Sequence, residues 1–206
     1  MIADIGNRHA HIKDKSSYKT LYYKELFNYK DSPLFYISVN KDFNQQAKDI
    51  KNWINLEPYI KLEGAYEGMG VDRKALLLSR GDGIYIDAGS AITIDIKKKN
   101  RFIGGAILPG LWAQKEALFK ISPVLKLDEI KKINLDILPK ENTKATLLYG
   151  IIAPVVALIE KFKKSYNLPI YITGGDGELI ASYIKEAEFK EDLIFEALEQ
   201  IVKEIE

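Results

Sequence analysis

The sequence predicts an α/β protein built from two similar half-domains, each with a mixed β-sheet and helices. Two observations lead to this prediction. An apolar strand ending in aspartate, a glycine-containing turn and a second apolar strand occur twice, with the turns at residues 4–7 and 87–90. The order of elements that follows the first copy restarts at the second. The natural break lies near residues 79–82, which gives half-domains of residues 1–80 and 81–206.

The first half is predicted to hold five strands and two helices. The strands are short apolar runs bounded by turn residues, at 2–5, 9–13, about 18–22, 34–39 and near 59–62. Apolar residues between positions 43 and 56 recur at the spacing of one helix face, which predicts a helix there. The segment from Gly68 to Arg73 opens a second helix that runs through Leu78.

The second half repeats this plan. Its strands are expected at 83–87, 91–96, 101–108 and 169–173. Its helices are expected from Gly110 through Phe119 and at 143–166, about 177–187 and 192–205. The lysine run at 97–99 is interpreted as a solvated turn between the second and third strands.

Composition limits the class of protein. With 47% hydrophobic residues and a formal net charge of +1, the chain resembles an ordinary globular protein, and nucleic acid or an anionic membrane is not expected as a partner. The absence of cysteine excludes disulfides, thiolate zinc sites and cysteine nucleophiles, and it suits a reducing cytoplasm. The chain reaches its first aspartate at position 4, which leaves no room for a signal peptide, so a cytoplasmic location is expected.

The two aspartate turns suggest phosphate chemistry. A carboxylate at a strand end can hold a hydrated cation, and a glycine lets backbone N–H groups approach an anion. The alternative is that each turn is an ordinary hairpin with a solvated carboxylate. A lysine motif of the Walker A type is absent from the sequence, so turn amides and a cation would have to hold the phosphates.

Asp72 and Arg73 form a second candidate pair. A carboxylate near an acceptor hydroxyl can orient it and take its proton, and a guanidinium offers a planar fork of donors to a substrate carboxylate. The alternative is structural: Asp72 would cap the helix that follows Gly70, and Arg73 would be a surface residue of its first turn.

Two further features favour structural interpretations. His9 and His11 alternate along a strand and face one side, but no third metal ligand is apparent, so they are interpreted as bystanders. The apolar run from Leu147 to Ile159 is too short to cross a bilayer and predicts a buried helix, either at the centre of a core or at a dimer seam. Pro154 is expected to kink this helix.

Taken in order, six segments resemble the type III pantothenate kinases of the actin-like superfamily. The segments are the two aspartate turns, Gly70-Val71-Asp72-Arg73, the run from Gly104 to Gly110, Thr143 with Ala145 and Gly150, and Thr173-Gly174-Gly175-Asp176. The resemblance implies two ribonuclease-H-like half-domains around a central cleft, the actin-like ATPase architecture. It also implies transfer of the ATP γ-phosphate to the 4′-hydroxyl of pantothenate, the first step of coenzyme A biosynthesis.

On the ATP side, the resemblance implies that Asp4 helps to hold Mg²⁺ and that Asp87 lies beside a potassium or ammonium ion. The residues that would contact ATP or its phosphates are Asp4, Gly6, Asn7, Arg8, Gly89, Ser90, Thr173, Gly174, Gly175 and Asp176. Arg8 departs from the family, which usually has threonine or serine there, and whether its guanidinium replaces that hydroxyl is left open.

On the pantothenate side, the resemblance makes Asp72 the catalytic base and places Gly70, Arg73 and Tyr66 at the substrate. Thr143 would reach the pocket of a neighbouring subunit, which implies a homodimer. Two alternatives stay open at this stage. One is another small-molecule kinase of the same superfamily, and the other is a non-catalytic nucleotide-binding regulatory protein.

Overall fold

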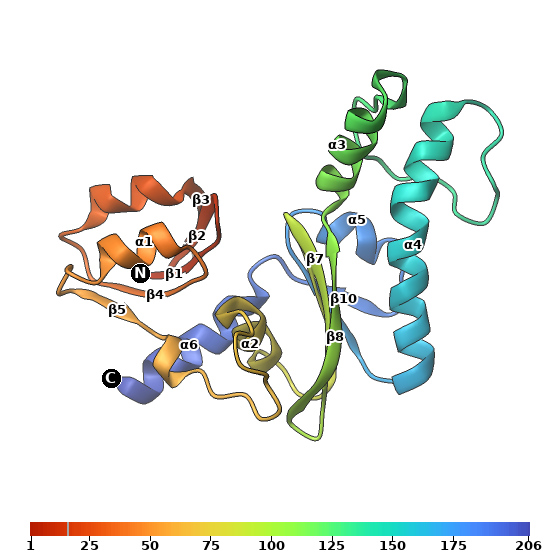
Figure 1. The fold of residues 1–206 in the computed structure, drawn as a ribbon. Helices are drawn as coiled ribbons and strands as arrows, with labels where there is room; N and C mark the ends of the chain where they lie inside the picture. Colours follow the sequence, from red (N-terminus) through yellow and green to blue (C-terminus); the bar gives the residue numbers. More distant parts are fainter. Residues whose placement is uncertain (16) are drawn as a thin grey trace. The chain divides into compact units, whose positions relative to one another are not determined.

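The structure is a computed structural model that describes residues 1–15 and 17–206. It contains two five-stranded sheets with helices, and the chain divides into two compact units (Figure 1). Unit 1 holds residues 1–81, 100–102 and 192–206, and unit 2 holds residues 82–99 and 103–191. The first break coincides with the expected one, and the C-terminal residues return to unit 1. The boundaries of two half-domains at 1–80 and 81–206 stay a prediction.

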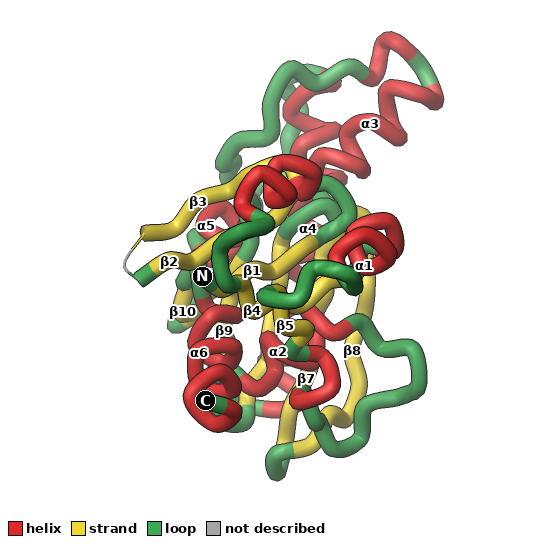
Figure 2. Tube along the Cα trace, turned by 90° about the vertical axis from the view of Figure 1, so that its left-hand side faces the viewer, coloured by secondary structure: helices red, strands yellow, loops and turns green. Residues whose placement is uncertain are grey.

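The sheet of unit 1 has the strand order β3-β2-β1-β4-β5 (Figure 2). Its strands are β1 (Ile2–Ile5), β2 (His9–Asp14), β3 (Ser17–Tyr22), β4 (Leu34–Ser38) and β5 (Trp53–Asn55). β1, β2 and β3 are antiparallel, whereas β4 and β5 run parallel to β1. The helices are α1 (Lys41–Ala47), α2 (Val71–Leu78) and α6 (Leu193–Ile205), with 3₁₀ turns at Tyr23–Tyr29 and Glu57–Tyr59.

The sheet of unit 2 repeats this topology, with the order β8-β7-β6-β9-β10. Its strands are β6 (Gly83–Ala88), β7 (Ala91–Lys98), β8 (Arg101–Pro109), β9 (Ile170–Thr173) and β10 (Ala187–Phe189). β7 is antiparallel to β6, and β9 and β10 are parallel to it. The helices are α3 (Leu111–Ile121), α4 (Thr143–Tyr166) and α5 (Gly177–Ala181), with a 3₁₀ turn at Pro123–Leu125. The predicted α/β class with two mixed sheets is confirmed.

Three local predictions are wrong. The helix expected over residues 43–56 ends at Ala47, because Trp53–Asn55 pairs with β4 as the edge strand β5. Residues 59–62 form no strand and follow a 3₁₀ turn. The helix expected over 177–187 stops at Ala181, and Ala187–Phe189 pairs with β9. In the first and third cases, pairing with a strand that is distant in sequence overrides a local apolar pattern.

Lys97 is also not the solvated tip that the lysine run predicts. It belongs to β7, opposite Gly83, and is only 4% exposed. Its ammonium lies 5.6 Å from the centre of the Tyr85 ring. Burial lowers its pKa, and the nearby Asp82 carboxylate partly offsets this effect. The turn proper is formed by Lys99 and Asn100, which both adopt positive φ angles.

Side-chain alternation gives the central strand of each sheet two different faces. In unit 1, Ala3 and Ile5 of β1 pack in a core with Phe43 of α1, so Asp4 points to the opposite face. In unit 2, Ile86 and Ala88 of β6 pack in a core with residues of α4 and α5, and the side chain between them is that of Asp87. Both aspartates therefore occupy the same position in equivalent strands.

α4 covers the apolar face of the unit 2 sheet. Five of its side chains are buried there: Leu148, Ile151, Ile152, Val155 and Ile159. With 24 residues, α4 extends beyond the apolar run at both ends, and it is long and apolar enough to cross a membrane by length and composition. A single such helix is weak evidence for a membrane span, because core helices meet the same criteria. Only 28% of its most apolar window is buried, because α4 buries one face against the sheet.

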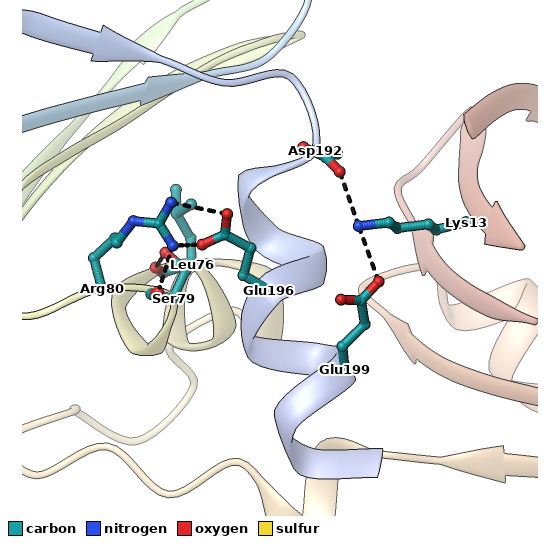
Figure 3. Close-up of polar contacts among 7 residues, drawn as sticks. All are labelled: Lys13, Leu76, Ser79, Arg80, Asp192, Glu196 and Glu199. Carbon is teal, nitrogen blue, oxygen red and sulfur yellow. Dashed lines mark hydrogen bonds and ion pairs between the residues drawn. The ribbon is translucent and has the colours of Figure 1, made fainter. Parts of the chain in front are cut away.

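Ion pairs attach α6 to the rest of unit 1 (Figure 3). The Lys13 ammonium on β2 lies 2.9 Å from carboxylate oxygens of both Asp192 and Glu199. Burial alone would lower the pKa of Lys13, but these two carboxylates outweigh it and hold the pKa above its usual value. Arg80, just after α2, pairs with Glu196 of α6.

We expect Lys13→Met to lower the free energy of unfolding by about 1 to 2 kcal/mol, because two partly buried carboxylates lose their shared cation. Urea unfolding at pH 7 measures the change. Lys51→Met is the control, since Lys51 is exposed in the turn before β5. Equal stability of the two variants would show that the ion pairs contribute nothing. Because the pKa of Lys13 is raised in the folded state, the contribution should be fully present at neutral pH and lost only as the pH rises through that raised pKa.

Candidate functional site

The first aspartate turn is fixed by main-chain bonds and by one buried asparagine. The Gly6 N–H donates to the His9 carbonyl at 2.9 Å. The Asn40 side-chain amide donates to the carbonyl of Asn7 at 3.0 Å, and its oxygen accepts the Phe43 N–H at 2.9 Å as the N-cap of α1. Asn40 was missed in the sequence, although an asparagine directly before a helix is a recognisable signal.

The tip of this turn is exposed. Asn7 and Arg8 are both exposed, and the Arg8 carbonyl accepts the Tyr23 N–H at 3.2 Å. The turn therefore presents these two residues to solvent while its base is held by Asn40. A phosphate contact by the Arg8 guanidinium, in place of the hydroxyl usual at this position, stays a prediction.

Asp72 and Arg73 lie in the first turn of α2, and the burial of Arg73 contradicts the part of the structural alternative that makes Arg73 a surface residue. The N-cap of α2 is Gly70, which makes no side-chain cap bond. The Asp72 carboxylate instead accepts the Arg73 N–H at 2.7 Å. A Cβ at position 70 would lie 2.5 Å from that carboxylate oxygen, so glycine is needed for its position. Arg73 is only 8% exposed and is not a surface residue.

Tyr66 is one hydrogen-bond partner of Arg73. The Arg73 guanidinium donates to the Tyr66 hydroxyl at 2.7 Å. The Tyr66 ring lies 6.1 Å from the Phe102 ring, and Phe102 is bonded through its N–H to the Glu63 carbonyl at 2.8 Å. Tyr66 also lines a shallow hollow of about 680 Å³ in unit 1, a size typical of small-molecule sites.

Asp4 and Asp72 belong to the same end of unit 1. The Val39 N–H, directly after β4, donates to the Ile5 carbonyl at the end of β1. A Cβ at Gly70 would lie 3.9 Å from the Val39 side chain, so the start of α2 adjoins these strand ends. The ends of β1 and β4 and the start of α2, which carry Asp4 and Asp72, therefore adjoin within one unit.

The second aspartate turn is enclosed by main chain on both sides within unit 2. The Gly89 N–H donates to the Ala91 carbonyl at 3.0 Å. On one side, the Gly110 N–H donates to the Ser90 carbonyl at 3.1 Å, and a Cβ at position 110 would overlap the Gly89 carbonyl. The run from Gly104 to Gly110 therefore supports this turn through its last glycine.

On the other side lies the Gly174 turn. Gly174 has φ of +91°, and a Cβ there would lie 2.6 Å from the Ala88 carbonyl and from the Asp87 carboxylate. The Asp176 N–H donates to the Ala88 carbonyl at 2.9 Å, and burial raises the pKa of the Asp176 carboxyl. Thr173 is bound to the Glu191 carbonyl through its hydroxyl at 2.9 Å.

The donors present suit a cation that is shared with phosphates. Among residues 1–15 and 17–206, no group of three or more histidine or carboxylate side chains could hold a metal on its own. Mg²⁺ is commonly held by one or two carboxylates together with substrate phosphates and water, which fits Asp4.

The His11 ring makes hydrogen bonds with the hydroxyls of Tyr18 and Thr20 at 2.9 and 3.0 Å. Burial lowers the pKa of His11, and the charge of His9 lowers it further.

Thr143 is the first residue of α4 and is exposed. Its neighbour Asn142 caps the helix by accepting the Ala145 N–H at 2.9 Å.

Each unit carries its own part of the predicted site. Asp4, Asp72 and Arg73 belong to unit 1, and the Asp87 turn, the Gly174 turn and Thr143 belong to unit 2.

Known proteins were compared with the chain. The family model for type III pantothenate kinase matches residues 37–165. A type III pantothenate kinase of Campylobacter jejuni is 38% identical over 205 residues, covering 99% of this chain and 97% of its own. The corresponding protein of Helicobacter pylori strain HPAG1 is 34% identical, covering 98% and 91%.

Solved structures agree with the fold. A Campylobacter jejuni protein described as a Baf family transcriptional activator has a TM-score of 0.88 and 39% identity, covering 99% of this chain and 98% of its own. A Sinorhizobium meliloti protein named as a 2-dehydro-3-deoxygalactonokinase has a TM-score of 0.57 at 9% identity, covering 99% and 96%, and it supports the fold alone. From the family model and the relatives over its whole length, the chain belongs to the type III pantothenate kinase family.

Proposed function

We propose that this protein transfers the γ-phosphate of ATP to the 4′-hydroxyl of pantothenate, with Asp72 as the general base. The observation that carries the residue assignment is the first turn of α2. There a carboxylate is oriented by the Arg73 N–H, beside a buried arginine that Tyr66 holds in place. An oriented carboxylate next to a fixed guanidinium is the arrangement needed for an alcohol substrate that also carries a carboxylate.

In this mechanism the hydroxyl of pantothenate lies against the Asp72 carboxylate, which takes up its proton as the oxygen bonds to the γ-phosphorus. The bond to the β-γ bridging oxygen breaks, and ADP leaves with that electron pair. Arg73 holds the pantothenate carboxylate and so aligns the hydroxyl. Mg²⁺ bound with ATP supplies charge neutralisation, and the position of Asp4 at the end of β1 supports its role as a ligand.

The second turn serves the phosphates through main chain. Support comes from the close approach of Gly110 and Gly174, which fixes the turn at residues 87–90 without any lysine. We assign Gly89, Ser90, Thr173, Gly174, Gly175 and Asp176 to ATP, together with Gly6, Asn7 and Arg8 of the first turn. A monovalent cation, K⁺ or NH₄⁺, beside Asp87 would offset part of the phosphate charge that a lysine offsets elsewhere.

A homodimer belongs to the same proposal, with Thr143 completing the neighbouring site. Its support is the surface of unit 2, which exposes large apolar side chains on or near α3. These are Ile107, Trp112, Ile121 and Val124, which are 57 to 80% exposed. Several large apolar side chains exposed on one segment support an interaction surface there. A cytoplasmic location is part of the proposal and is supported by the cysteine-free sequence.

Two alternatives are separated from this proposal by one assay of ADP release. Another kinase of the superfamily would release ADP with a sugar or a different carboxylate and not with pantothenate. A regulatory protein, as suggested by the name of the Campylobacter jejuni structure, would release no ADP in response to any acceptor. The buried Arg73 beside Asp72 favours the kinase, because a nucleotide-binding regulator has no need of an acceptor-side acid.

We expect Asp72→Asn to lower kcat by about 10²- to 10⁴-fold, the usual contribution of a general base. The asparagine oxygen can still accept the Arg73 N–H, so the melting temperature should stay near that of the wild type. A coupled ADP assay and a thermal melt measure both. Asp42→Asn is the matched control, because Asp42 is the exposed acid at the same position of α1. Near-normal turnover of Asp72→Asn would refute the assignment of the base.

Tyr66→Phe removes the hydroxyl that orients Arg73. A hydrogen bond to a charged group contributes about 1 to 2 kcal/mol, so KM for pantothenate should rise roughly 5- to 30-fold while KM for ATP is unchanged. Steady-state kinetics with each substrate varied in turn provide the measurement. Tyr59→Phe serves as the control, since that ring is 50% exposed in the same unit. An unchanged KM for pantothenate would remove Tyr66 from the substrate side.

Gly174→Ala tests the support of the second turn. The positive φ and the overlap with Ala88 and Asp87 should destabilise the protein by about 2 to 4 kcal/mol and abolish ADP release. Gly150→Ala is the control in the same unit, because Gly150 is exposed on α4 and a Cβ there meets nothing within 4 Å. Urea unfolding and the ADP assay are run on both variants. If Gly174→Ala behaved like Gly150→Ala, the close packing would have no role in the site.

A further inference from the structure

Asp87 lies between two threonines on one face of the unit 2 sheet. In the antiparallel pair of β6 and β7 it is directly opposite Thr93, and in the parallel pair of β6 and β9 it is opposite Thr173. Their neighbours within the strands, Ile86, Ala88, Ile92, Ile94 and Ile172, pack in the core with α4 and α5. By alternation, the carboxylate and both hydroxyls therefore share the face away from that core.

The two threonines differ in how their hydroxyls are satisfied. The Thr173 hydroxyl donates to the Glu191 carbonyl at 2.9 Å. The Thr93 hydroxyl oxygen is buried and has no hydrogen-bond partner among the residues that the structure describes. A buried hydroxyl without a partner is destabilising, and valine would fill the same space without that cost. The fold of the chain therefore gives no reason for a hydroxyl at position 93.

The charges around Thr93 favour a cation over an anion. Asp87 lies directly across from it, and Asp95, which is 1% exposed, lies two residues further along the same face of β7. Lys97 lies a further two residues along this face and is buried beside Tyr85. A phosphate oxygen next to Thr93 would be repelled by the Asp87 carboxylate, whereas a metal ion would be attracted by it.

The matching position in unit 1 offers no such oxygen. There Asp4 is opposite His11, whose ring is already engaged by Tyr18 and Thr20. A neutral hydroxyl oxygen has lone pairs that suit a hard monovalent cation, and a hydrogen-bonded imidazole does not. Only the turn of unit 2 thus combines a carboxylate with an unused oxygen, which distinguishes the two aspartate turns chemically.

We propose that the Thr93 hydroxyl is a ligand of the monovalent cation that binds beside Asp87. This inference rests on the proposed function in one respect, because it identifies a residue that holds the cation assigned there to Asp87. It assigns Thr93 a role as a ligand and positioning residue, not as a group that contacts the reacting atoms. It also explains why a threonine is present at a buried site where its hydroxyl otherwise costs stability.

The test uses the whole protein without ATP or pantothenate. Melting temperatures of the wild type, Thr93→Val and Thr93→Ser are measured while potassium chloride replaces choline chloride at constant ionic strength. For the wild type and Thr93→Ser, potassium should raise the melting temperature. For Thr93→Val, the potassium concentration at half effect should rise at least 10-fold, although its melting temperature in choline is equal to or above that of the wild type.

A potassium response in Thr93→Val equal to that of the wild type would overturn the inference, as would a wild type that does not respond to potassium. Thr93→Ala gives a second comparison if the valine variant does not fold, and it should lose the response in the same way. The proposed function is judged separately, by pantothenate-dependent ADP release from the wild type. An enzyme that phosphorylates pantothenate without any potassium response would refute the Thr93 ligand and leave the kinase assignment intact.

Discussion

The alternation of side chains along the two central strands is the constraint on which the rest of the structure depends. In β1 and in β6, the residues on either side of the aspartate are committed to a core, Ala3 with Ile5 and Ile86 with Ala88. The aspartate between them must then point to the opposite face. A shift of one residue in either strand would bury the carboxylate and expose the core, so the packing of the core fixes the position of the chemistry.

The two turns that follow these strands are held in different ways. In unit 1 the side chain of Asn40 binds the turn carbonyls, and the tip remains exposed. In unit 2 backbone packs directly on backbone, because Gly110 and Gly174 approach the turn where any side chain would collide. The second turn is therefore the more rigid support, and its cation would be bound by groups whose positions are already set. Such preorganisation lowers the cost of holding a charged ligand.

The acceptor side follows a similar rule, in which a charged group is placed by a partner before the substrate arrives. Arg73 is buried, and a buried charge is costly unless it is hydrogen-bonded; the Tyr66 hydroxyl is one of its partners. A substrate carboxylate can then bind a guanidinium that is already oriented. The packing of Phe102 on Tyr66 extends this support to the start of β8, a strand far away in sequence.

The sequence by itself determined the paired aspartate turns, the strands around them and the identity of Asp72 and Arg73 as a candidate pair. These features are local, because period-two alternation and glycine turns are expressed within a few residues. Tertiary structure alone decided that Trp53–Asn55 and Ala187–Phe189 are edge strands, that Lys97 is buried, and that Arg73 is held by Tyr66. It also decided the role of Asn40 and the unsatisfied hydroxyl of Thr93. Each of these depends on a neighbour brought close by strand pairing or helix packing, and no local pattern in the chain specifies that neighbour.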